Sequence, residues 1–200
     1  MKHIQHLSKD KNLKKIIATQ TAYVLVKKTD VYLHLCGSIM SQQLNTKVAA
    51  IIFERFLNLY PTRQPTPQQI VDTSIETLRS IGLSNAKANY VHNVCNFFLL
   101  EKITDEKLDS LSNEEIIKYL IQIKGVGQWT VEMILMFTLG REDVFALDDL
   151  GIQQSIIKLY KLDVLTKKQL REKMQEISKN WSPYRTYACR YLWGWKDNVL

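Results

Sequence analysis

The residues of this chain that could do chemistry are a glycine turn, Gly125-Val126-Gly127, and an acidic pair, Asp148-Asp149, one helical segment later. Glycines adopt backbone angles that other residues resist, and without Cβ atoms they let another backbone come close. A helix is expected to begin near Gln128, so its first-turn N–H groups could bind a phosphate. Such a turn could equally well serve only to reverse the chain, and either aspartate could be only a helix N-cap.

The apolar pattern around these residues predicts an all-α fold. Ser112 and Glu115 form a capping box ahead of an apolar run, and Ser182-Pro183 is interpreted as a cap followed by proline at the first helical position. The prolines between 61 and 67 mark a loop and a helix start, and 144–146 is the only strand-like fragment. The helices are expected at 30–43, 45–59, 74–81, 84–100, 112–124, 128–139, 149–160, 166–179 and 183–195.

Composition indicates a globular protein that is not made for a membrane or for an oxidising compartment. Two hundred residues, 46% of them apolar, suit one compact unit or two small lobes. No apolar run reaches the ~20 residues that span a bilayer, and the N-terminus lacks a signal-peptide core. Cys36, Cys95 and Cys189 are odd in number and far apart, which favours a reducing compartment without a disulfide framework.

The positive charge gathers at the two chain ends. Residues 1–28 carry seven basic residues and one acidic, and 158–200 carry ten and four, so each end has a net charge of +6. The stretch 29–157 has ten basic and fifteen acidic residues, a net charge of −5. If the ends pack together they form one basic lobe suited to a polyanion, although a solvated lysine-rich surface is an equal alternative.

Several segments, taken together, resemble the helix-hairpin-helix DNA glycosylases, and within them the alkylbase branch of DNA-3-methyladenine glycosylase II. They occur in the family's order over about 31–195. They are Ile39-Met-Ser-Gln-Gln-Leu44 with Ala49-Ala50, Ile81-Gly-Leu-Ser-x-x-Lys-Ala-x-Tyr90, the glycine turn with Trp129-Thr130, Asp143-Val-Phe-x-x-Asp-Asp149-x-x-Ile152, and Trp181-x-Pro-x-Arg-x-Tyr-Ala188 with Leu192-Trp193.

The resemblance implies a two-lobed glycosylase fold with a central cleft, formed by residues 1–200 as one unit. Lobe one is a helical barrel of about 31–146 that ends in the helix-hairpin-helix, 112–140. Lobe two combines about 1–30 with 147–200, which places Asp149 at the cleft. The alkylbase branch often has an extra N-terminal α/β domain, and only about 30 residues precede the matching region here.

The resemblance also assigns the chemistry. The family places its catalytic aspartate at a helix start with isoleucine three residues on, a register that selects Asp149 over Asp148. Its carboxylate would stabilise the oxocarbenium character of the sugar while the base leaves. Bifunctional relatives have a nucleophilic lysine where this chain has Trp129, so the resemblance implies hydrolysis by water and no lyase activity.

Aromatic residues are expected to form the base pocket. Trp129 and Trp193 match the family's pocket walls, and Met133 one turn after Trp129 is a third candidate. An indole face suits a cationic base such as 3-methyladenine or 7-methylguanine. Ordinary core packing remains the alternative for all three.

The remaining site residues concern DNA. The target base must leave the duplex, and Leu44 or Gln43 is the expected wedge that fills the gap. An ordinary helix end with exposed polar residues is an equal alternative for this loop. A monovalent cation, Na or K, is a candidate at the carbonyls of Ile121, Ile123 and Val126, and three scattered cysteines exclude an iron–sulfur cluster. The expected DNA-binding residues are Lys124, Gly125, Val126, Gly127, Gln128, Gln42, Gln43 and Leu44.

The sequence is therefore interpreted as a monofunctional base excision repair glycosylase that releases alkylated purines. Its partner is double-stranded DNA with damaged bases, and it is expected to be monomeric and intracellular, nucleoid-associated if prokaryotic. Another base-excision glycosylase, of the oxidised-purine or uracil type, and a non-catalytic helix-hairpin-helix DNA-binding module remain alternatives.

Overall fold

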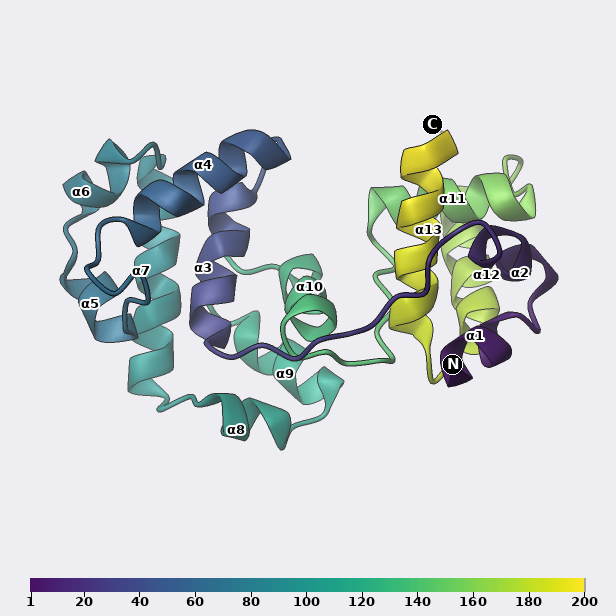
Figure 1. Ribbon diagram of the computed structural model, residues 1–200, viewed down its shortest axis with the longest axis horizontal. Coiled ribbons are helices and arrows are strands. Elements are labelled where there is room, and N and C mark those ends of the chain that lie inside the picture. Colours follow the sequence, from purple (N-terminus) through teal and green to yellow (C-terminus); the bar gives the residue numbers. More distant parts are fainter. Residues whose placement is uncertain (200) are drawn as a thin grey trace. The chain divides into compact units, whose positions relative to one another are not determined.

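The structure is a computed structural model that describes residues 1–199, and within that range the backbone forms helices and no β-strand (Figure 1). The helices are α1 (Lys2–Leu7), α2 (Lys11–Ile17), α3 (Val31–Ser41), α4 (Thr46–Leu57), α5 (Pro67–Asp72), α6 (Ile75–Ser80), α7 (Asn85–Leu100), α8 (Asp105–Asp109), α9 (Asn113–Leu120), α10 (Gln128–Phe137), α11 (Leu150–Tyr160), α12 (Lys167–Lys179) and α13 (Arg185–Val199). The expected all-α fold is confirmed.

Side-chain caps set where most of these helices begin. A serine, threonine, asparagine or aspartate oxygen accepts a first-turn backbone N–H at the start of nine of the described helices, from α2 to α12. The predicted box of Ser112 and Glu115 is present, because each side chain bonds the other residue's backbone N–H. The helix boundaries therefore follow from local sequence.

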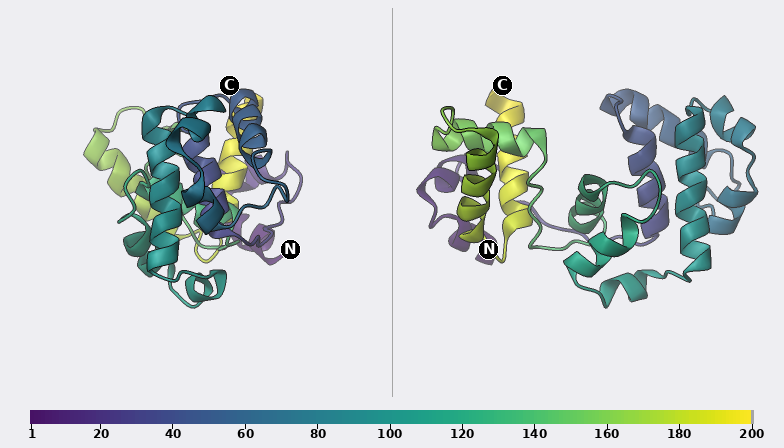
Figure 2. Two further views of the ribbon diagram at one scale, coloured as in Figure 1. Left: turned by 90° about the vertical axis from the view of Figure 1, so that its left-hand side faces the viewer. Right: turned by 180° about the vertical axis from the view of Figure 1, so that it is seen from behind.

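Residues Lys28–Ile134 form one compact unit, called here the middle unit. Its centre is α7, against which α3, α5 and α6 pack, and α4 packs on α3. Figures 1 and 2 show α3 and α7 side by side. Gly82, with φ +113°, ends α6 and lets the chain turn into α7.

Residues Met1–Lys27 and the chain from Leu135 onward form a second compact unit, called the terminal unit. In it α13 packs against α11 and α2. Trp181 is fully buried and donates its indole N–H to Asp10 at 3.1 Å, which ties the N-terminal helices to the C-terminal ones. The terminal unit holds 17 basic and 9 acidic residues, a net charge of +8, whereas the middle unit holds 10 and 11. The two basic chain ends therefore share one unit.

Along the chain, the two units meet between residues 27 and 28 and between residues 134 and 135. The sequence interpretation instead divided the chain between residues 30 and 31 and between residues 146 and 147. The second helix of the helix-hairpin-helix, α10, crosses the second boundary.

Two sequence expectations were wrong. Residues 144–146 are not a strand: the N–H of Val144 donates to the Thr186 hydroxyl at 3.1 Å instead of to a neighbouring strand. Ser182 and Pro183 do not start the last helix, which begins at Arg185. The Ser182 hydroxyl instead donates to Asp143 at 2.8 Å.

Helices α1 and α2 were not expected at all. They are six and seven residues long, too short to show a clear helical period.

Among the described residues, no helix has the length and apolar character needed to cross a membrane, and no group of three metal-binding side chains occurs.

Candidate functional site

The glycine turn has the geometry that its sequence predicts, and its two glycines have different roles. Gly125 has φ +104°, and a Cβ there would lie 2.3 Å from the ring of Tyr90, so only glycine fits. At Gly127 no atom lies within 4 Å of the position that a Cβ would occupy, and its carbonyl accepts the N–H of Val131 at 3.2 Å. Gly125 therefore fits the hairpin onto α7, and Gly127 leaves the start of α10 open to an approaching backbone.

The exposed end of this hairpin can hold an anion. Because α10 begins at Gln128, its first-turn N–H groups and the positive end of its dipole lie beside Gly127. Lys124, Gly127 and Gln128 are exposed, whereas the side chain of Val126 is buried and anchors the turn. The geometry suits a contact between backbone amides and a phosphate that does not depend on base sequence.

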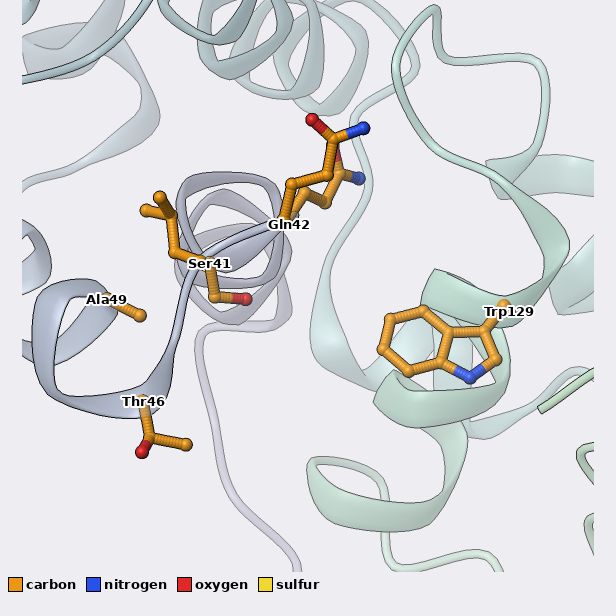
Figure 3. A pocket seen from close by; sticks show the side chains of 7 residues that line it. Ser41, Gln42, Thr46, Ala49 and Trp129 are labelled. Carbon is orange, nitrogen blue, oxygen red and sulfur yellow. The ribbon is translucent and has the colours of Figure 1, made fainter. Parts of the chain in front are cut away.

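Trp129 borders a pocket of about 500 Å³ in the middle unit. This residue is 44% exposed, so it does not belong to the core of the unit. Figure 3 shows the indole on one side and Thr46 and Ala49 of α4 on the other. An exposed indole at a pocket can stack on a planar ring. The pocket is lined by Ser41, Gln42, Gln43, Leu44, Thr46, Ala49 and Trp129, and Met133, which is half-buried, is not part of this lining.

The loop between α3 and α4 forms the rim of the same pocket, and it has an unusual backbone. Gln43 has φ +60°, a left-handed conformation that is uncommon outside glycine and often occurs at functional sites. Leu44 is 37% exposed. The residues expected to act as the wedge are thus surface residues beside Trp129.

The candidate catalytic carboxylate lies in the terminal unit. Asp149 is the N-cap of α11, where its Oδ1 accepts the N–H of Ile152 at 2.8 Å. The same oxygen accepts the indole N–H of Trp193, from α13, at 2.9 Å. The structure thus brings together two residues that the sequence interpretation assigned separately. A Cβ at Gly151 would lie 3.1 Å from Asp149 Oδ1 and 3.2 Å from Trp193, so glycine there makes room for this contact.

Asp148 is in a different environment from Asp149. It is exposed and forms a salt bridge with Arg171 of α12. Asp149 is half-buried and held by two N–H donors from separate helices. A fixed, partly desolvated carboxylate can stabilise a developing positive charge better than a solvated surface carboxylate.

The segment before Asp149 is tied to the helix that carries Trp193. Asp143 accepts the Nε–H of Arg185, at the start of α13, at 2.6 Å, and a second guanidinium N–H at 2.9 Å. Burial raises the pKa of Asp143, but the bonds from Arg185 and Ser182 and the Arg185 charge outweigh it and hold that pKa below its usual value. Trp193 itself is half-buried and its ring centroid lies 5.8 Å from that of Phe137.

The carbonyls proposed for a cation belong to the turn that joins α9 and α10. The carbonyl of Ile123 accepts the N–H of Val126 at 3.0 Å, which keeps one of its two lone-pair directions engaged. Carbonyl oxygens are suitable ligands for a hard monovalent cation, so these three carbonyls stay a predicted donor set.

Two residues of the sequence segment Ile81–Tyr90, Lys87 and Tyr90, were quoted without a role, and Asn93 and Glu132 were missed. Lys87, Tyr90 and Asn93 of α7 contact the pocket loop or the hairpin. Glu132 of α10 is a buried carboxylate that accepts the side-chain N–H of Gln128 at 2.9 Å. The spacing of three residues from 87 to 90 to 93 was the available signal, since it puts these side chains on one helix face.

Comparison with known proteins relates this geometry to DNA repair enzymes. The family model described as HhH-GPD superfamily base excision DNA repair protein matches residues 36–180. DNA-3-methyladenine glycosylase 1 of Schizosaccharomyces pombe is 37% identical over 194 residues, which cover 96% of this chain and 84% of that protein. A putative DNA-3-methyladenine glycosylase of Bacillus subtilis is 33% identical over 196 residues, covering 95% of this chain and 67% of that protein.

Solved structures agree with these sequence matches. The 3-methyladenine DNA glycosylase of S. pombe in complex with abasic DNA has a TM-score of 0.84 and 35% identity, covering 96% of this chain and 95% of that one. A DNA-3-methyladenine glycosidase from Bacillus halodurans has a TM-score of 0.83 and 34% identity, covering 96% and 87%.

Proposed function

Because this chain belongs to the HhH-GPD superfamily of base excision DNA repair proteins, we propose that it is a monofunctional DNA glycosylase for alkylated purines. Relatives at 37% and 33% identity over most of its length are named DNA-3-methyladenine glycosylases. The reaction is hydrolysis of the bond between the base and C1′ of deoxyribose, with the base flipped from duplex DNA.

One observation supports this function most strongly: the carboxylate of Asp149 is fixed by N–H donors from α11 and α13. As the base departs, positive charge develops on the sugar, and a preorganised carboxylate beside C1′ lowers the energy of that state. The base leaves with the electron pair of the glycosidic bond. Water then adds to C1′ and releases its proton to solvent. The salt bridge of Asp148 with Arg171 makes it the weaker candidate for this role.

The second part of the proposal concerns the base. Trp129 offers an exposed indole at a pocket, and stacking on an indole favours a cationic ring such as 3-methyladenine or 7-methylguanine. Methylation also weakens the glycosidic bond of these purines, since the base carries a positive charge that it loses on departure. Trp193 and Met133 remain proposed pocket residues.

The absence of a lysine at position 129 supports hydrolysis without strand cleavage, since lyases of this family form a Schiff base from that position. Borohydride added during turnover should trap no protein–DNA adduct. Efficient trapping would contradict the monofunctional assignment.

The DNA partner is bound without sequence preference in this proposal. Phosphates are contacted by the terminal unit, which has a net charge of +8, and by the hairpin from Lys124 to Gln128. The base stack of the duplex is entered by Gln42, Gln43 and Leu44. We also propose a monovalent cation, Na or K, at the carbonyls of Ile121, Ile123 and Val126, and a monomer that acts on chromosomal DNA within the cell.

The activity test is a panel of duplexes, each with one lesion, incubated with the purified protein under single-turnover conditions. Release of 3-methyladenine and 7-methylguanine should exceed release of uracil or 8-oxoguanine by orders of magnitude. Preference for 8-oxoguanine or uracil would favour another glycosylase, and binding without release of any base would favour a non-catalytic DNA-binding module.

A further inference from the structure

One face of α7 holds both the loop between α3 and α4, which lines the Trp129 pocket, and the hairpin that precedes Trp129. Lys87, Tyr90 and Asn93 follow one another at intervals of three residues, so their side chains leave the helix on the same side. Lys87 reaches the loop between α3 and α4, whereas Tyr90 and Asn93 reach the hairpin. All of these residues belong to the middle unit.

Lys87 holds the end of α3. Its Nζ donates to the carbonyls of Met40 at 3.0 Å and Gln42 at 2.6 Å. The last carbonyls of a helix lack intrahelical partners, and the negative end of the helix dipole attracts a cation there. Partial burial lowers the pKa of Lys87. The next residue along the loop, Gln43, is the one in the left-handed conformation.

Tyr90 and Asn93 hold the hairpin. The Tyr90 ring fills the space where a Cβ of Gly125 would lie, and the Asn93 amide donates to the carbonyl of Lys124 at 3.1 Å. The side-chain amide of Gln42 donates to the carbonyl of Gly125 at 3.4 Å, which links the two loops directly. The loop and the hairpin therefore have a fixed spacing that α7 sets.

We propose that Lys87 is a positioning residue that holds residues 42–44 in the conformation that enters the gap left by the flipped base. This inference rests on the proposed function, because it assigns a base-flipping role to that loop. A loop held in its inserted shape before binding loses less conformational freedom when it enters the DNA stack. Lys87 then affects recognition of the gap without touching phosphate.

The variant that tests this is Lys87→Met, which keeps the length of the side chain and removes its donors. Lys107→Met is the matched control. The Nζ of Lys107 donates to the carbonyl of Glu101 at 2.9 Å, just beyond the other end of α7, so its loss removes a similar bond in the same unit. Lys107 is outside the proposed DNA-binding residues.

The measurement is the affinity of each protein for two duplexes of one sequence, one intact and one with a tetrahydrofuran abasic-site analogue. We expect Lys87→Met to reduce the preference for the abasic duplex about tenfold, the value of one charge-assisted hydrogen bond. Its affinity for intact duplex and the salt dependence of that affinity should stay at the parental values. Lys107→Met should retain the parental preference.

Three results would overturn the proposal. The first is a Lys87→Met protein that prefers the abasic duplex as strongly as the parent does. The second is a Lys107→Met protein that loses as much of this preference as Lys87→Met. The third is a slope of log affinity for intact duplex against log salt concentration that Lys87→Met lowers by about one, as the loss of one phosphate contact would. If Lys87→Met does not fold, Lys87→Gln, which keeps a neutral donor, replaces it in the same comparison. Failure of the proposed function is separate, since it appears as a parent protein that releases no damaged base.

Discussion

The two glycines of the hairpin provide a prediction in which stability and DNA binding respond in opposite ways. Gly125→Ala places a Cβ 2.3 Å from the Tyr90 ring at a backbone φ of +104°. The left-handed conformation costs an L-residue about 1–2 kcal/mol. Overpacking against the ring adds about 1–3 kcal/mol. The free energy of unfolding should therefore fall by about 2–5 kcal/mol, which lowers Tm by roughly 4–20 °C for a protein of this size.

Gly127→Ser should leave the free energy of unfolding nearly unchanged and weaken DNA binding. No atom lies within 4 Å of its Cβ position, and a residue whose carbonyl accepts the first bond of α10 is an N-cap, a position that serine favours. Stability should change by less than about 0.5 kcal/mol. The new hydroxyl would bond the first-turn N–H groups and crowd the phosphate, so affinity for undamaged duplex should fall about tenfold.

The assay pairs thermal melting with duplex binding at a fixed salt concentration. Equal destabilisation by the two substitutions, or parental DNA affinity of a folded Gly127→Ser protein, would refute the division of roles between the glycines.

Three further predictions concern single side chains. Trp193→Phe keeps an aromatic ring but removes the N–H that fixes Asp149. Single-turnover base release should therefore fall by roughly tenfold or more, with little change in Tm. An unchanged rate would show that the bond between Trp193 and Asp149 has no role in catalysis. Trp129→Ala should lower methylpurine release more than release of neutral lesions. Because Trp129 is 44% exposed, the variant should still fold. Equal losses for both lesion types would exclude a cation–π contribution. Burial and the charge of the amino terminus lower the pKa of His3 from 6.5, so the folded state prefers the neutral ring and loses stability as pH falls below about 6.5. The variant His3→Phe retains the stacking on Tyr187, and its Tm should fall less than the parental Tm between about pH 7 and pH 5. Equal falls in Tm would contradict this.

The parts of the fold that were predictable are those encoded within a few residues. The capping box at Ser112, the turn closed by the Val126 N–H on the Ile123 carbonyl and the N-cap at Asp149 each depend on residues within four positions. For α2 the same kind of signal was present, since Asp10 caps a segment in which Leu13, Ile16 and Ile17 are buried. A helix of seven residues shows too little of this pattern to stand out.

The contacts that complete the site could not be read from local patterns. The bond between Trp193 and Asp149 joins residues 44 positions apart. The bonds from Lys87 to the carbonyls of Met40 and Gln42 join residues 47 and 45 positions apart. Such contacts depend on which helices pack together, and a lysine in a helical segment is normally a solvated surface residue. The cap role of Ser182 failed for the same reason, because its hydroxyl bonds the distant Asp143.

In the proposed reaction the carboxylate of Asp149 drives hydrolysis of the glycosidic bond. This role is tested by the single-turnover rate of 7-methylguanine release by Asp149→Asn and Asp148→Asn, measured with the affinity of each protein for the same duplex. Asp149→Asn should lower the rate by about 10²-fold or more and leave affinity largely intact, since the amide cannot stabilise the charged sugar. Asp148→Asn removes only an exposed salt bridge with Arg171 and should lose far less. A greater loss from Asp148→Asn, or a parental rate in Asp149→Asn, would contradict the catalytic role of Asp149.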